Sequence, residues 1–133
     1  MLSHLFAIVV SAVVMFALGG FWYSPMLFGH VWARESGTPE EHNPDRRAQT
    51  RFFLILLALL MLAAGVLDCI IASWAPGPGL GHGLAVGIIG GALATAVIGM
   101  DTLFERKSLT LFFINSGYYL IGFCATGVIL ALL

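Results

Sequence analysis

Charged residues are scarce in this sequence of 133 residues. Asp, Glu, Lys and Arg together make up 10% of the chain, whereas hydrophobic residues make up 59% and the mean hydropathy is +0.97. So few polar side chains cannot coat a water-soluble globule of this length. The composition therefore excludes an ordinary soluble domain and predicts a protein whose solvent is lipid.

The sequence also lacks the motifs of common enzymes and of metal sites. It has no phosphate-binding loop, nucleophile elbow or zinc-protease helix, and its two cysteines and four histidines have no metal-ligand spacing. The histidines fall at the ends of apolar runs or between them, which argues against a bis-histidine haem. No basic patch suggests nucleic acid. We therefore expect no catalytic activity, no metal, no cofactor and no nucleic-acid partner.

Four long apolar runs are present instead. Each is close to the ~20 residues that a helix needs to cross a hydrocarbon layer of ~30 Å. Unbroken runs lack the alternation of a membrane β-barrel. The sequence thus predicts an all-α integral membrane protein with one domain over residues 1–133. The expected spans are about residues 2–23, 52–74, 84–104 and 109–133.

The distribution of basic residues predicts the orientation. Four arginines lie in the first connection, residues 24–51, and Arg106 and Lys107 lie in the third, whereas the second connection, residues 75–83, has no Lys or Arg. Loops with excess Lys and Arg stay in the cytoplasm. We therefore expect a multi-pass membrane protein with the first and third connections inside and both termini on the outer side.

Helix-breaking residues divide the first connection. Pro25 should end the first helix, because proline restricts the residue before it and cannot donate an amide hydrogen bond. Apolar residues at helical spacing from Met26 to Trp32 then predict a short interfacial helix that Gly37 closes. Two helix-start signals follow, at residues 38–41 and at Asn43-Pro44, and we take the second as the start of the next helix.

The other two connections differ in length. Residues 75–83 are rich in proline and glycine, which predicts a turn without helical content. Only four residues separate the third and fourth spans, so these helices should form a tight antiparallel hairpin, with Ser108 as the N-cap of the fourth.

Small residues recur at every fourth position of the third span. Such a ridge lets two helix backbones approach closely, which is a main source of helix association in lipid. The pattern does not identify the partner, and we favour a helix of the same chain over another subunit. The ridge consists of Gly83, Gly87, Gly91, Thr95 and Gly99.

Asp68 is the costliest residue for a membrane helix. A carboxylate in the middle of a span costs roughly 2.5 to 3.5 kcal/mol on insertion scales. Counting ~1.5 Å per residue along the helix places it in the outer leaflet, at a depth that His4 can reach. One interpretation is a proton or ligand site, and the other is a carboxylate, paired with histidine or protonated, that fixes helix packing. We favour the second.

Polar and aromatic side chains should also gather in the inner leaflet. Asp101 lies a few residues from the end of the third span, at the depth of residues that end the first span and begin the fourth. The group could be a functional site, but an aromatic belt with hydrogen bonds between helices explains it slightly better. Its members are Trp22, Tyr23, Ser24, Pro25, Asp101, Asn115 and Tyr118.

Two motifs carry a family resemblance. Residues 19–32 follow the pattern G-x-x-W-Y-S-P-x-x-F-G-x-x-W, and a second motif runs from Leu103 to Tyr118. Together they resemble the small bacterial membrane family called domain of unknown function seventeen sixty-one. Where that family often has histidine, this chain has Tyr119. The resemblance implies a four-helix protein of the bacterial inner membrane without a stated activity, and it adds weight to the inner-leaflet group, apart from Asp101, as one unit.

These observations favour a protein that works through contact. We expect a homo-oligomer or an accessory subunit of a larger membrane complex, with the ridge and the interfacial helix as contact surfaces. The alternative is a small proton-coupled transporter or channel that uses Asp68. The sequence is also compatible with a bound lipid, quinone or pigment against the glycine-rich face.

Overall fold

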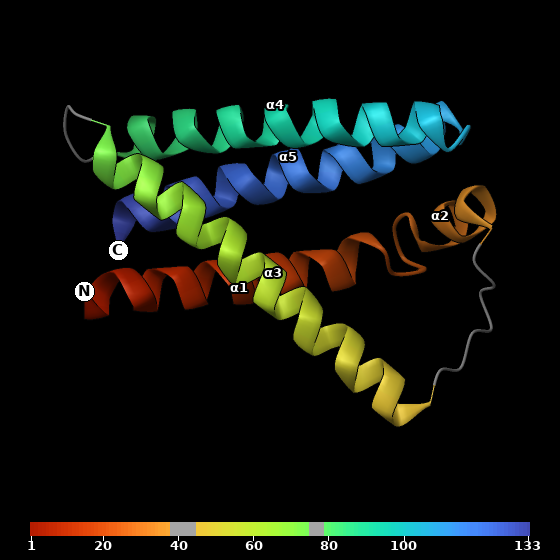
Figure 1. The fold of residues 1–133 in the computed structure, drawn as a ribbon, viewed down its shortest axis with the longest axis horizontal. Helices are drawn as coiled ribbons and strands as arrows, with labels where there is room; N and C mark the ends of the chain where they lie inside the picture. Colours follow the sequence, from red (N-terminus) through yellow and green to blue (C-terminus); the bar gives the residue numbers. More distant parts are fainter. Residues whose placement is uncertain (38–44, 75–78) are drawn as a thin grey trace.

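The computed structural model describes residues 1–37, 45–74 and 79–133, and within them the chain forms five α-helices and no strand (Figure 1). Four of the helices are long and apolar enough to cross a membrane, whereas the remaining one, α2, has eight residues. The predicted fold class is therefore confirmed. The helices are α1 Leu2–Trp22, α2 Gly29–Ser36, α3 Arg46–Ser73, α4 Leu80–Phe104 and α5 Leu109–Leu132.

The two ends of the bundle differ in charge. Both termini lie at one end, which we call the terminal end (Figure 1). The opposite end holds α2, the start of α3 and the turn between α4 and α5, and these segments contain all six Lys and Arg residues. We call it the basic end.

Three helix boundaries follow the signals in the sequence. α1 ends at Trp22, and the chain turns through Ser24 and Pro25 so tightly that the Gly29 amide donates to the Ser24 carbonyl oxygen at 2.9 Å. Gly37 ends α2 with a φ of 74°, a conformation that glycine adopts without strain. Ser108 caps α5, because its hydroxyl oxygen accepts from the Leu111 amide at 3.2 Å.

The start of α4 differs from the expected turn over residues 75–83. Helix begins at Leu80, and the Gly83 amide already donates to the Gly79 carbonyl oxygen at 3.1 Å. Glycine here does not break the helix, because Gly83 is buried against α5 and gains packing there. The two helix-start signals of the first connection lie outside the described residues, and α3 begins at Arg46.

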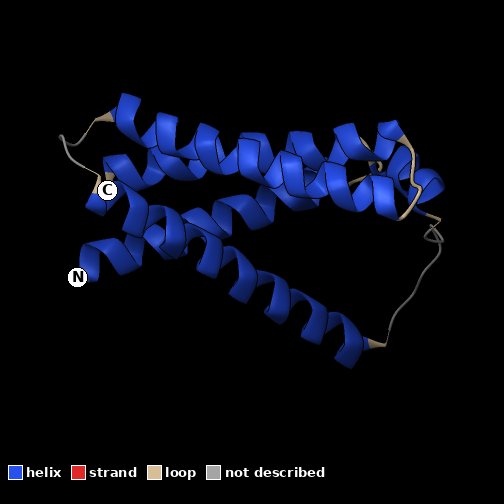
Figure 2. Cartoon of the chain, turned by 45° about the horizontal axis from the view of Figure 1, so that its top comes forward, coloured by secondary structure: helices blue, strands red, loops and turns tan. Residues whose placement is uncertain are grey.

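α4 and α5 lie side by side along their whole length, and α1 packs on both α5 and α3 (Figures 1 and 2). Two buried clusters hold the bundle. The first, near the terminal end, contains Ala7, Leu67, Val86 and Leu130. The second, nearer the middle, contains Ala12, Met15, Leu60 and Tyr118.

α3 leaves the bundle on its way to the basic end. Both views show its first half diverging from the other helices (Figures 1 and 2). Residues 45–55 are all exposed, and the buried residues of α3, namely Leu60, Ala64 and Leu67, lie in its second half. The divergence opens the molecule at the basic end.

Candidate functional site: a pocket at the basic end

A pocket of about 720 Å³ lies where α3 diverges, and residues of all five helices line it. This volume is within the range of roughly 300 to 1,000 Å³ that is typical of small-molecule sites. The first half of α3 supplies Phe52, Phe53 and Leu56, while α1 supplies Phe16 and α2 supplies Trp32. These walls are therefore apolar and largely aromatic.

Acidic side chains occur among the lining residues near the end of α4. Asp101 and Glu105 are both exposed, and no other described residue makes an ion pair or hydrogen bond with either carboxylate. The pocket has one basic lining residue, Lys107, whose ammonium group donates to the Ser36 carbonyl oxygen at the end of α2, at 3.3 Å. The lining thus carries two carboxylates against a single ammonium that already has an acceptor.

Hydrogen bonds to α5 fix the remaining wall. The Tyr23 hydroxyl donates to the Asn115 side-chain oxygen at 2.8 Å, and the Tyr118 hydroxyl donates to the Met15 carbonyl oxygen at 2.9 Å. The ring centroids of Tyr23 and Tyr118 lie 5.5 Å apart, and those of Tyr118 and Tyr119 lie 4.9 Å apart. α1 and α5 therefore form a continuous aromatic surface on this side of the pocket.

The structure divides the group predicted for the inner leaflet. Tyr23, Asp101, Asn115 and Tyr118 all line the pocket. The other three members are not among the lining residues, although all three lie within two residues of Tyr23 in the chain.

Each of these three has another place in the structure. The Trp22 indole nitrogen donates to the Ile114 carbonyl oxygen at 2.9 Å, which joins α1 to α5. The Ser24 hydroxyl donates to the Phe21 carbonyl oxygen at 2.6 Å, and Pro25 is exposed in the turn. These residues shape the end of α1 rather than the pocket.

Sequence reasoning missed the contribution of α3 to this site. Phe52 and Phe53 directly follow Arg51, so the sequence predicted that they lie near the basic end. Nothing in the sequence showed that they face the polar residues of the other helices. Tyr119 and the charged residues Glu105 and Lys107 were not assigned to it either. The signal for Tyr119 was its position next to Tyr118 on the helix that carries Asn115.

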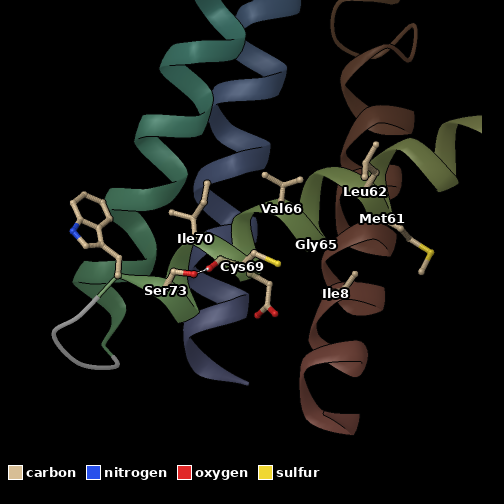
Figure 3. A pocket seen from close by; sticks show the side chains of 10 residues that line it. Ile8, Met61, Leu62, Gly65, Val66, Cys69, Ile70 and Ser73 are labelled. Atoms are coloured by element: carbon tan, nitrogen blue, oxygen red, sulfur yellow. Dashed lines mark hydrogen bonds between the residues drawn. The ribbon is translucent and has the colours of Figure 1, made fainter.

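A second polar feature lies at the terminal end. The His4 Nδ1 atom is 3.1 Å from both carboxylate oxygens of Asp68, so the structure brings together the two residues that depth alone had associated. The Asp68 side chain is 14% exposed and that of His4 is 57% exposed. A shallow groove beside the pair runs along α3, with Ile8 of α1 on its rim, and the Ser73 hydroxyl donates there to the Cys69 carbonyl oxygen (Figure 3). It shares no residue with the pocket at the basic end.

The small-residue ridge packs against α5 of the same chain. A Cβ atom at Gly83 would collide with the Gly127 carbonyl oxygen, and one at Gly87 would collide with the Phe123 carbonyl oxygen and lie 2.8 Å from the Cys124 Cα atom. The remaining members make looser contacts. Gly91 lies against Leu120 and Gly99 lies against Phe112, both of α5. The Thr95 hydroxyl instead donates within α4, to the Gly91 carbonyl oxygen at 2.8 Å.

The family comparison agrees with the motifs. The model of the family described as protein of unknown function (DUF1761) matches residues 6–131. Because this match covers nearly the whole chain, the protein belongs to that family. No curated protein and no solved structure matches the chain.

Proposed function

We propose that this member of the DUF1761 family is a membrane protein without catalytic activity that works by packing against another membrane chain, and that its partner is a second copy of itself. The observation that carries the proposal is the divergence of α3. No residue in the first half of this membrane helix is buried, while α4 and α5 are packed together along their length.

The way in which helices pack in lipid explains why the exposed first half of α3 is expected to contact another chain. Lipid tails are as apolar as the side chains, so membrane helices associate through close van der Waals contact rather than through removal of apolar surface from water. The buried residues of α3 begin at Leu60. Before it, the helix meets the bundle through partly exposed side chains such as Phe53, whose ring centroid lies 5.5 Å from that of Phe16 on α1. Its side chains Phe52, Leu54 and Ile55 are 62%, 63% and 54% exposed. The glycine ridge already contacts α5, so α3 replaces it as the proposed contact surface.

The charges at the start of α3 support a second copy as the partner. Arg46, Arg47 and Arg51 line a shallow hollow on α3, and Asp45 precedes them in an exposed position. Two copies in one membrane have the same orientation, so their α3 helices present these residues at the same depth. A two-fold contact can then pair Asp45 of each copy with an arginine of the other.

Cysteine cross-linking in native membranes tests this proposal. The two native cysteines are first replaced by alanine. Ile55→Cys on α3 is then compared with Ile89→Cys on α4, because both isoleucines are 54% exposed. After mild oxidation we expect a disulfide-linked dimer from the α3 variant and little from the α4 variant. Equal dimer yields would contradict the proposal, and capture of a different membrane protein at Ile55→Cys would instead support an accessory subunit.

The pairing of His4 with Asp68 favours a second candidate, a proton-coupled transporter. Two titratable groups at 3.1 Å could exchange a proton, although the groove beside them is shallow. The test is flux into vesicles that contain the purified protein, under an imposed proton gradient. We expect no flux of protons or cations from the wild type. A flux that disappears in a folded Asp68→Asn variant would overturn the contact proposal.

A further inference from the structure

We propose that the pocket at the basic end binds an organic cation with a bulky apolar body, such as an amphipathic amine or phosphonium. This inference goes beyond the contact function, because the pocket is formed within one chain. It depends on the shape of the pocket, on its aromatic walls and on the balance of charge in its lining.

The walls suit an apolar body. Phe52 and Phe53 of α3 line the pocket together with Tyr23 at the end of α1 and Tyr119 of α5. The pocket volume of about 720 Å³ admits a ligand with several rings. Aromatic faces carry partial negative charge, so they attract a cation in addition to packing against its apolar groups.

The charges of the lining select a cation over an anion. Asp101 and Glu105 are free of ion pairs within the described residues. The ammonium of Lys107 donates to the Ser36 carbonyl oxygen and keeps its positive charge, so the lining has two carboxylates against one ammonium. A cation in the pocket would gain the attraction of one or both carboxylates, whereas an anion would be repelled by them. A neutral ring such as a quinone would gain only the contacts with the walls.

The arginines do not reverse this balance. Arg46, Arg47 and Arg51 line the separate hollow on α3, which has no lining residue in common with the pocket. The apolar side chains Phe52 and Phe53, which line the pocket, directly follow Arg51 in the chain. The three arginines of α3 therefore lie outside the pocket lining, and Lys107 is the basic residue within it.

Equilibrium dialysis with a pair of matched ions tests the inference. The full-length protein in detergent micelles is dialysed against radiolabelled tetraphenylphosphonium or against tetraphenylborate, which has the same four phenyl groups and the opposite charge. Protein-free micelles measure the partition of each ion into detergent. We expect saturable binding of tetraphenylphosphonium and no saturable binding of tetraphenylborate. Equal binding of the two ions, or displacement of the cation by a neutral quinone at equal concentration, would overturn the proposal.

Charge-neutral variants locate the binding site. Asp101→Asn should weaken binding of tetraphenylphosphonium about five- to tenfold, because it removes one carboxylate from the lining. The matched control is Glu35→Gln on α2, which removes the same charge at the same end from a residue outside the pocket lining. An equal loss of affinity in both variants would show a general charge effect and contradict the assigned site.

A second pair of variants tests the aromatic wall independently. Tyr119→Phe keeps the ring and should bind tetraphenylphosphonium as the wild type does, whereas Tyr119→Leu should bind it several-fold more weakly. Thermal unfolding in the same detergent confirms that both variants are folded. If leucine and phenylalanine at this position gave the same affinity, the ring of Tyr119 would not contact the ligand.

Discussion

Single glycines determine how closely α4 can lie on α5. At Gly83 and Gly87 of α4 the backbone of α5 occupies the space of a side chain, and the same holds for Gly127 of α5 against Gly83. The approach is therefore backbone to backbone over about the first two turns of α4. A methyl group there has no flexible neighbour that could move aside.

This contact gives a prediction with a control in the same helix. Gly87→Ala should lower the free energy of unfolding in detergent by about 1 to 3 kcal/mol, because the added methyl group would overlap the Phe123 carbonyl oxygen. Gly81→Ala should not destabilise, because no atom lies within 4 Å of the position that its added methyl group would take. Denaturant or thermal unfolding of both variants provides the measurement. Equal stability of the two would contradict a tight α4–α5 contact.

Two neighbouring tyrosines provide another comparison at the same scale. The buried Tyr118 hydroxyl donates to the Met15 carbonyl oxygen, whereas no hydrogen bond from the Tyr119 hydroxyl occurs among the described residues. Tyr118→Phe should therefore cost about 0.5 to 1.5 kcal/mol of stability. Tyr119→Phe should cost close to nothing in the same unfolding assay. A larger loss of stability in Tyr119→Phe than in Tyr118→Phe would contradict these hydrogen-bond assignments.

The depth of individual residues in the membrane could be predicted from the sequence. The groups that they contact on neighbouring helices could not. The rise per residue is fixed, so counting from the ends of the spans placed His4 and Asp68 at similar depth, and the structure brings them within 3.1 Å. By contrast, the partner of Tyr118 is the carbonyl of Met15, a backbone group that no sequence pattern marks. Helices that are apolar on every side do not reveal which side faces which neighbour.

At the scale of helices, the sequence predicted helix boundaries better than it predicted how the helices pack. Pro25, Gly37 and Ser108 stand at the three boundaries expected of them. The glycines at the start of α4 misled the prediction, because glycine is common in turns and also at close helix contacts. The divergence of α3, on which the pocket depends, has no local signal in its apolar sequence.

The attachment of α3 can be tested with two adjacent leucines. Leu60 is 4% exposed in the central cluster, while Leu59 is 56% exposed and faces lipid. Leu60→Ala should lower the free energy of unfolding by about 2 kcal/mol, at the low end for such cavities, because lipid removes the transfer term. Leu59→Ala should have little effect. Similar losses in the two variants would mean that α3 packs along a different face.

At the scale of the whole molecule, the two ends of the bundle have different properties. The terminal end is held by the cluster around Leu67 and Val86, where α1, α3, α4 and α5 meet. The basic end is open between α3 and the other helices and holds the pocket. Which aqueous compartment each end faces decides where a ligand would meet the pocket, and the sequence predicts that the basic end faces the cytoplasm.

Fusions to reporter proteins test this orientation. Because all six Lys and Arg residues lie at the basic end, both termini should face outward. Alkaline phosphatase fused after Leu133 should then be active and green fluorescent protein fused there should be dark. As a control, phosphatase fused after Gly37, in the first connection, should be inactive. The reverse pattern would place the basic end outside and would contradict the orientation. In that case a cation would reach Asp101 from the outer aqueous side rather than from the cytoplasm.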